Sequence, residues 1–86
     1  MPFRITNRFT KQYSKKQVEE QKKVDDTIDL LGANPKHPGL HAHRIQGTKG
    51  IWECCVDDSL RITFEYGNDC IILRNNCHHD ISRRNH

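Results

Sequence analysis

The second half of the chain alternates apolar and polar residues, which is the pattern of strands with one buried face. The clearest case is 60–66, Leu-Arg-Ile-Thr-Phe-Glu-Tyr, in which every second residue is apolar or aromatic. Successive side chains of a strand point to opposite faces. We therefore predict a strand whose apolar face joins a core while Arg61 projects from the other face.

The segments around 60–66 predict further strands. Residues 51–57 predict a strand, 67–69 a hairpin turn and 70–73 a last strand. The sheet is expected to begin with three alternate residues, His41, His43 and Ile45. In this arrangement Glu53 and Glu65 are the obvious ion-pair partners for Arg61.

The first half of the chain predicts one short strand and two helices. Residues 3–6 alternate and predict the strand, and Phe9 and Tyr13 lie four residues apart, as on one face of a helix. A second helix is expected over about 15–31, because Ser14 opens a sequence with the form of a capping box.

This order of elements predicts an α+β fold. An N-terminal strand and a helical hairpin should pack on one face of a three- to four-stranded antiparallel sheet, leaving the other face partly open. Residues 1–86 are expected to form a single domain. Only 34% of the residues are hydrophobic, so the core should be thin.

Charge and targeting signals narrow the class of protein. The formal net charge of +3 is compatible with an anionic partner. No apolar run is long enough to cross a membrane, and the first residues do not form a signal peptide, so we expect a cytoplasmic protein. The four cysteines lack the spacing of a zinc ribbon or a disulfide scaffold and are expected to be reduced.

Histidines bracket the predicted strands. His43 precedes them and His79 follows them, while Arg61 lies in the middle of one strand. Imidazoles can transfer protons near neutral pH, and a guanidinium can bind two phosphate oxygens at once. The pattern therefore indicates a site for a phosphate-bearing ligand.

Five short stretches, taken in order, resemble the RelE/ParE toxin superfamily of bacterial type II toxin–antitoxin systems. They are Asn34-Pro35-Lys36-His37-Pro38-Gly39-Leu40, His43-Arg44-Ile45-Gln46-Gly47, Ile51-Trp52-Glu53, Arg61-Ile62-Thr63-Phe64 and Cys77-His78-His79-Asp80. The resemblance covers nearly the whole chain and is closest to the compact RelE-like members, related to YafQ and YoeB, whose sequences end in a His-His-Asp or Thr-His-Asp motif. It implies a fold similar to that of small microbial ribonucleases, and cleavage of messenger RNA in the ribosomal A site.

The resemblance also implies roles for individual residues. His43 and His79 would be an acid–base pair, with the base not assigned between them, and Arg61 would hold the phosphate. Six further residues are candidates for contacting RNA or supporting the site: His41, Arg44, Lys49, Arg74, His78 and Asp80. No cofactor or metal is expected. The chain departs from the family at Cys55, where some members have a histidine, at Cys77, where glycine is usual, and in lacking a C-terminal tyrosine.

The expected function is that of a toxin which inhibits translation as a ribosome-dependent endoribonuclease. Its expected partners are a cognate antitoxin, the ribosome and messenger RNA, with no membrane, and with operator DNA only through the antitoxin complex. Two alternatives stay open. One is a ParE-like gyrase inhibitor or an inactive toxin fold that only binds its antitoxin. The other is a metal site formed by His41, His43, Cys77 and His79, which offer suitable nitrogen and sulfur ligands.

Overall fold

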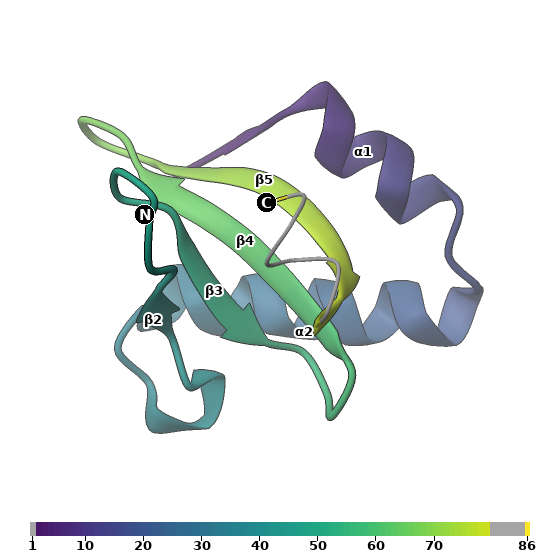
Figure 1. Cartoon of the computed structure of the whole chain (residues 1–86). Helices are drawn as coiled ribbons and strands as arrows, with labels where there is room; N and C mark the ends of the chain where they lie inside the picture. The colour runs from purple at the N-terminus through teal and green to yellow at the C-terminus, as the bar shows by residue number, and fades with distance from the viewer. Residues whose placement is uncertain (1, 80–85) are drawn as a thin grey trace.

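Two helices and a five-stranded sheet make up the computed structural model, which describes residues 2–79 and 86 (Figure 1). In chain order the elements are β1 (Phe3–Ile5), α1 (Asn7–Ser14), α2 (Val18–Ala33), the short 3₁₀ turn η1 (Pro38–Leu40), β2 (His43–Arg44), β3 (Trp52–Cys55), β4 (Leu60–Tyr66) and β5 (Ile71–His78). The α+β class predicted from the sequence is confirmed.

The sheet has the strand order β1-β5-β4-β3-β2. Strands β2 to β5 pair with their neighbours in antiparallel fashion, as predicted. The N-terminal strand β1 adds to this sheet by pairing in parallel with β5. The sheet therefore has five strands rather than the expected three or four. The last strand also runs to His78 rather than ending at Leu73. Asn75 and Asn76 have poor intrinsic strand preference, yet both pair with β4 in the antiparallel ladder. Pairing with β4 therefore overrides local preference.

The helix boundaries differ from the expected ones. Ser14 ends α1, and its hydroxyl donates to the Thr10 carbonyl at 2.6 Å instead of capping the next helix. The second helix begins at Val18, and Gln17 precedes it without a side-chain cap. The prediction of a capping box that begins at Ser14 is therefore wrong.

Thr6 fixes α1 against the sheet. Its hydroxyl oxygen accepts a hydrogen bond from the Phe9 N–H at 3.2 Å, which caps the helix. The same hydroxyl lies 2.9 Å from the Leu73 carbonyl on β5 and donates to it. One side chain thus begins the helix and ties it to β5.

The core lies between the helices and one face of the sheet, with α2 crossing behind the strands in Figure 1. The buried residues include Phe9, Val24, Leu31, Leu40, Cys54, Leu60, Ile62, Phe64, Ile71 and Leu73. Burial raises the pKa of the Cys54 thiol to about 12, so this cysteine acts as a small apolar residue. No helix in the described part of the chain has the length and apolar character needed to cross a bilayer.

His41 does not belong to the sheet, contrary to expectation. It follows η1 with a left-handed backbone (φ 48°), and β2 begins at His43. The turn before β2 thereby separates His41 from the strand position that would have placed it beside His43.

Candidate functional site: a buried carboxylate ringed by cationic side chains

Glu53 is a fully buried carboxylate on β3. The strand alternates, so Glu53 lies on the face opposite Cys54 and therefore opposite the helical core. Burying a charged carboxylate is costly unless cationic or hydrogen-bonding groups surround it. The groups that surround Glu53 are the three residues predicted to be catalytic.

One carboxylate oxygen of Glu53, Oε1, faces all three of these side chains. It lies 3.4 Å from His43 Nε2, 3.5 Å from His79 Nδ1 and 3.9 Å from Arg61 Nε. They come from β2, from β4 and from the residue that follows β5. The sequence predicted the histidines and the arginine, and the structure places them around a single oxygen atom.

The strand register explains this convergence. His43 is paired directly with Glu53 across β2 and β3. Arg61 pairs with Cys55, two residues along β3 from Glu53 on the same face. On its other side Arg61 pairs with Cys77, so β5 delivers His79 just beyond it.

His43 has an acceptor beside each of its ring nitrogens. Its Nδ1 lies 3.0 Å from the His41 carbonyl oxygen, and its Nε2 faces the Glu53 carboxylate. Both neighbouring groups are hydrogen-bond acceptors, so the ring is held from both of its nitrogens. Half of the side chain, 49%, is exposed, so the ring is also accessible to a ligand.

His79 is held from two sides. Its backbone N–H donates to the Ser59 carbonyl at 2.8 Å, which fixes the chain after β5 beside the β3–β4 turn. Its ring turns Nδ1 toward Glu53 and so directs Nε2 away from that carboxylate. With 44% of the side chain exposed, the ring is accessible to a ligand.

Arg61 is largely enclosed. Its Nη1 donates to the Asp57 carbonyl at 2.6 Å and to the Leu60 carbonyl at 3.1 Å, and only 13% of the side chain is exposed. Arg61 therefore supplies fixed positive charge at the floor of the site. Replacing it would also remove bonds that hold the β3–β4 turn, so Arg61→Ala is not a clean test of chemistry.

Asp57 organises this turn. Its Oδ1 accepts the backbone N–H of Leu60 at 2.7 Å and of Ser59 at 2.9 Å, and its Oδ2 pairs with Lys23 at 3.3 Å. Burial raises the pKa of Asp57, but the two backbone donors and Lys23 lower it further, so the net shift is downward. The turn holds both Arg61 and His79 and thereby positions the site.

We expect Asp57→Asn to weaken the acid dependence of stability. The carboxylate has a lower pKa when folded, so it contributes stability at neutral pH that is lost as the pH falls below about 4. Urea unfolding at pH 7 and pH 3 should show a smaller loss of unfolding free energy in Asp57→Asn than in the wild type. Asp58→Asn, in the same turn, is the matched control and should lose as much as the wild type. Equal losses in all three proteins would contradict the assigned role of Asp57.

The remaining predicted residues are dispersed over other parts of the surface. Arg44 lies beside His43 on β2, and Lys49 is exposed in the following turn. Arg74 pairs with Glu65 at 3.5 Å, and its Nε donates to the His86 backbone oxygen at 3.0 Å. His41 and His78 line two further, separate cavities. Asp80 lies outside the described residues.

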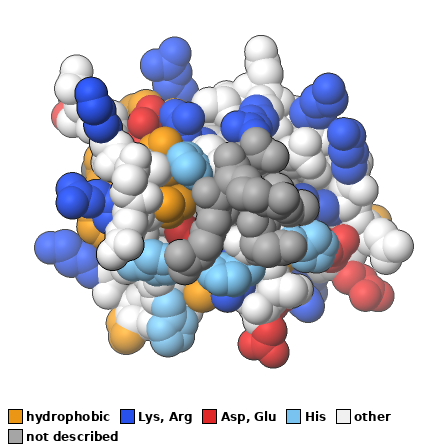
Figure 2. All heavy atoms as spheres, viewed as in Figure 1, with side chains coloured by type: hydrophobic (Ala, Val, Ile, Leu, Met, Phe, Trp, Pro, Cys, Tyr) orange, Lys and Arg blue, Asp and Glu red, His pale blue; other side chains and the backbone are white. Residues whose placement is uncertain are grey.

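Sequence reasoning missed the central role of Glu53, which it treated only as a possible ion-pair partner of Arg61. The available signal was a carboxylate inside a strand, two positions from Cys55 and paired by register with a histidine. Among the described residues, no group of three or more histidine, cysteine or acidic side chains is arranged to hold a metal ion. Figure 2 shows several histidines gathered on the face of the sheet opposite α2.

No protein-family model matches the sequence, and no curated protein sequence matches it either. Solved structures do match. A copper-bound mutant toxin from Helicobacter pylori is 19% identical with a TM-score of 0.77, covering 94% of this chain and 97% of that one. YafQ in the Escherichia coli DinJ–YafQ toxin–antitoxin complex is 15% identical with a TM-score of 0.76, covering 92% of each chain.

A third match is the YoeB/ParE toxin from Agrobacterium tumefaciens. It is 14% identical with a TM-score of 0.78, covering 92% of this chain and 99% of that one. The matches span almost the full length on both sides, although few residues are identical. Over more than nine-tenths of its length, the chain therefore has the fold of the RelE/ParE-family toxins.

Proposed function

We propose that the protein is the toxin of a type II toxin–antitoxin system and inhibits translation by cleaving messenger RNA on the ribosome. The observation that carries this proposal is the convergence of His43, Arg61 and His79 on the buried Glu53 carboxylate. Such a cluster combines proton-transfer groups with fixed positive charge, which is what phosphodiester cleavage without a metal requires.

The proposed reaction is an attack of a ribose 2′-oxygen on the adjacent phosphorus. A base removes the 2′-hydroxyl proton, a bond forms from the 2′-oxygen to phosphorus, and the bond from phosphorus to the 5′-oxygen breaks. An acid protonates the departing 5′-oxygen, which leaves a cyclic phosphate and a 5′-hydroxyl. Negative charge builds up on the phosphate oxygens during the attack, so fixed cations lower the barrier.

The geometry supports separate roles for the two histidines. Glu53 faces Nδ1 of His79 and favours a proton there, which makes Nε2 the acceptor and His79 the base. His43 is the other exposed imidazole beside Glu53, so we assign it the role of the acid. Arg61, held by two carbonyl oxygens, supplies positive charge to the phosphate without becoming the proton source.

The partners follow from this role. YafQ of the same fold is solved in a toxin–antitoxin complex with DinJ, and we propose a cognate antitoxin for this chain. Its other partners would be the ribosome and messenger RNA in the cytoplasm, with operator DNA reached only through the antitoxin complex.

The enclosure of Arg61 favours a second candidate, a toxin fold that acts by binding alone. A guanidinium that is 13% exposed and already donates to two carbonyls offers less to an RNA phosphate than an open one. In that case the protein would inhibit gyrase in the manner of ParE, or would only bind an antitoxin.

A translation extract tests the proposal. We expect the purified protein to truncate a reporter message while ribosomes elongate, and to leave the message intact when initiation is blocked. Primer extension would map the new 5′ ends. An intact message together with inhibited supercoiling by purified gyrase would reject the ribonuclease function and support the second candidate.

A further inference from the structure

The outer edge of β5 is paired with another strand only as far as Leu73. Strand β1 pairs only with Ile71–Leu73, so beyond that point no described strand covers this edge. Helix α1 lies beside it instead, and a cavity of about 300 Å³ opens between them. This cavity is distinct from the Glu53 site, since none of the four residues of that site lines it.

The side chains that line this cavity suit an anion. Arg8 of α1 and Lys16 of the connection between α1 and α2 are its basic residues, and the other lining residues include Gln12, Asn75, Asn76 and His78. No acidic residue is among the described residues that line it. A guanidinium and an ammonium group together favour a phosphate group over a neutral ligand.

Lys16 is fixed at this cavity rather than extended into solvent. Its ammonium donates to the Asn76 carbonyl at 2.7 Å and to the Gln12 carbonyl at 3.3 Å. Burial lowers the pKa of Lys16, against smaller opposing effects of Glu20 and Cys77. A partly desolvated ammonium gains more from a nearby anion than a fully hydrated one does.

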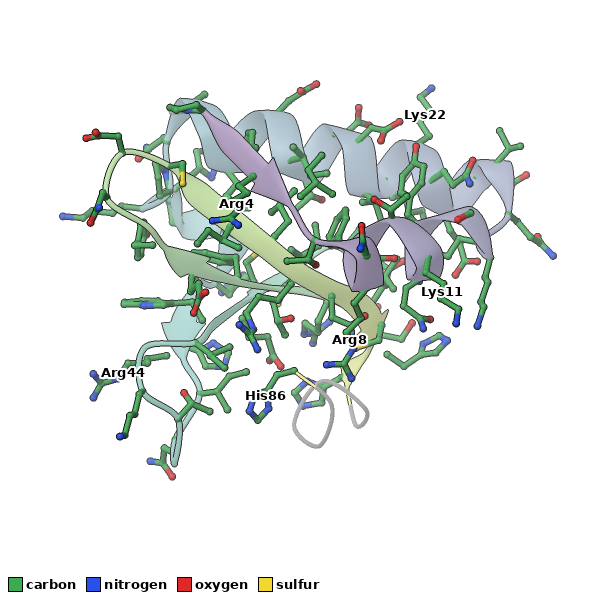
Figure 3. All side chains as sticks on the ribbon, turned by 90° about the horizontal axis from the view of Figure 1, so that it is seen from above. Arg4, Arg8, Lys11, Lys22, Arg44 and His86 are labelled. Carbon is green, nitrogen blue, oxygen red and sulfur yellow. The ribbon has the colours of Figure 1, made fainter. Side chains whose placement is uncertain are left out.

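The cavity is close to the candidate active site along the chain. His78 lines it, and the next residue, His79, faces Glu53. Two consecutive histidines, the last residue of β5 and the residue after it, therefore belong to two separate sites. In Figure 3, Arg8 points from α1 toward the end of β5, whereas Lys22 on α2 points away from it.

We propose that this cavity is a second phosphate subsite, which holds a backbone phosphate of the RNA strand next to the cleaved bond. This inference rests on the proposed function, because the phosphate belongs to the same RNA strand. The contact is with the backbone, so it adds affinity and register without reading sequence.

The test measures binding without cleavage. The probe is a short single-stranded RNA whose riboses are all 2′-O-methylated, so no 2′-hydroxyl can attack. Its affinity for the whole chain is measured over a range of salt concentrations. Losing one phosphate contact on a single strand should reduce the slope of log K against log salt by about 0.7.

Arg8→Ala is the variant of choice, because Arg8 is exposed and its loss should not disturb the fold. We expect it to weaken binding about tenfold at low salt and to reduce the salt slope. Lys22→Ala removes the same charge from α2 and is the matched control, with a slope equal to that of the wild type. Failure of the probe to bind, or equal slopes in the two variants, would overturn the subsite.

Ribosomal RNA offers the same phosphate chemistry, so binding to vacant ribosomes is measured in parallel. An effect of Arg8→Ala on vacant ribosomes but not on the oligonucleotide would overturn the assignment to the cleaved strand. The subsite and the ribonuclease function fail separately. If Arg8→Ala reduces the salt slope but the wild type does not cleave the message, the subsite is supported and the ribonuclease function is rejected. If the wild type cleaves the message but Arg8→Ala leaves the salt slope unchanged, the ribonuclease function is supported and the subsite is rejected.

Discussion

Glu53→Gln should reduce message cleavage by about 100-fold or more while leaving the protein folded. Glutamine has nearly the same volume but no charge, so it can neither favour the proton on Nδ1 of His79 nor balance His43 and Arg61. Each positioned proton-transfer group is typically worth about 10²–10⁴-fold in rate. The measurement is the rate of reporter cleavage in a translation extract at equal concentrations of folded protein.

Stability distinguishes this role from that of an ordinary buried ion pair. Removing one partner of a structural buried pair typically costs about 3–5 kcal/mol, because a charge is left uncompensated. Here Arg61 keeps its two carbonyl acceptors, and the two histidines are about half exposed to water. We therefore expect the unfolding free energy of Glu53→Gln to change by no more than about 1 kcal/mol.

Glu65→Gln is the matched control. Glu65 lies on the neighbouring strand and pairs with Arg74 at 3.5 Å, with one-third of each side chain exposed. Such a pair contributes about 0–1 kcal/mol, so its loss should change neither cleavage nor stability measurably. Full cleavage by Glu53→Gln, combined with a large loss of stability, would make Glu53 a structural residue only.

His79→Gln should have the second large effect, a fall in the cleavage rate of about 10²–10⁴-fold. Glutamine can still reach polar neighbours but cannot take up a proton at neutral pH. The backbone bond to Ser59 is kept, since it uses the main-chain N–H of residue 79. Cleavage in the extract and relief of growth arrest in cells are the two measurements.

His37→Gln is the control for this substitution. His37 lies before η1 in a separate cavity, where its Nδ1 accepts the Gly39 N–H at 3.0 Å. It should cleave as fast as the wild type. If His79→Gln remained as toxic and as active as His37→Gln, the assignment of His79 as the base would be wrong.

The sequence predicted the fold class well where the information is local. The alternation of 60–66 defines β4, and Leu60, Ile62 and Phe64 are all buried as expected. Helix ends were less predictable, because Ser14 satisfies its hydroxyl within α1 rather than at the start of α2. A short polar side chain has several backbone partners within reach, and the sequence does not rank them.

Contacts between distant segments were not predictable in the same way. The parallel pairing of β1 with β5 joins residues about seventy positions apart, and nothing in 3–6 specifies the partner strand. The extension of β5 through two asparagines likewise depends on the ladder with β4. Strand register depends on how the whole sheet packs, so the residues of one strand do not by themselves predict its partner or the point at which it ends.

The sequence by itself determined which residues alternate, which segments are helical, and that histidines flank the strands while an arginine lies within one of them. Only the tertiary structure decided that His43, Arg61 and His79 meet at one oxygen of Glu53, that His41 lies elsewhere and that His78 lines a second cavity. The physical reason is that side-chain alternation is a property of each strand, whereas the partners of a buried charge depend on strand register and on the turns that fix it.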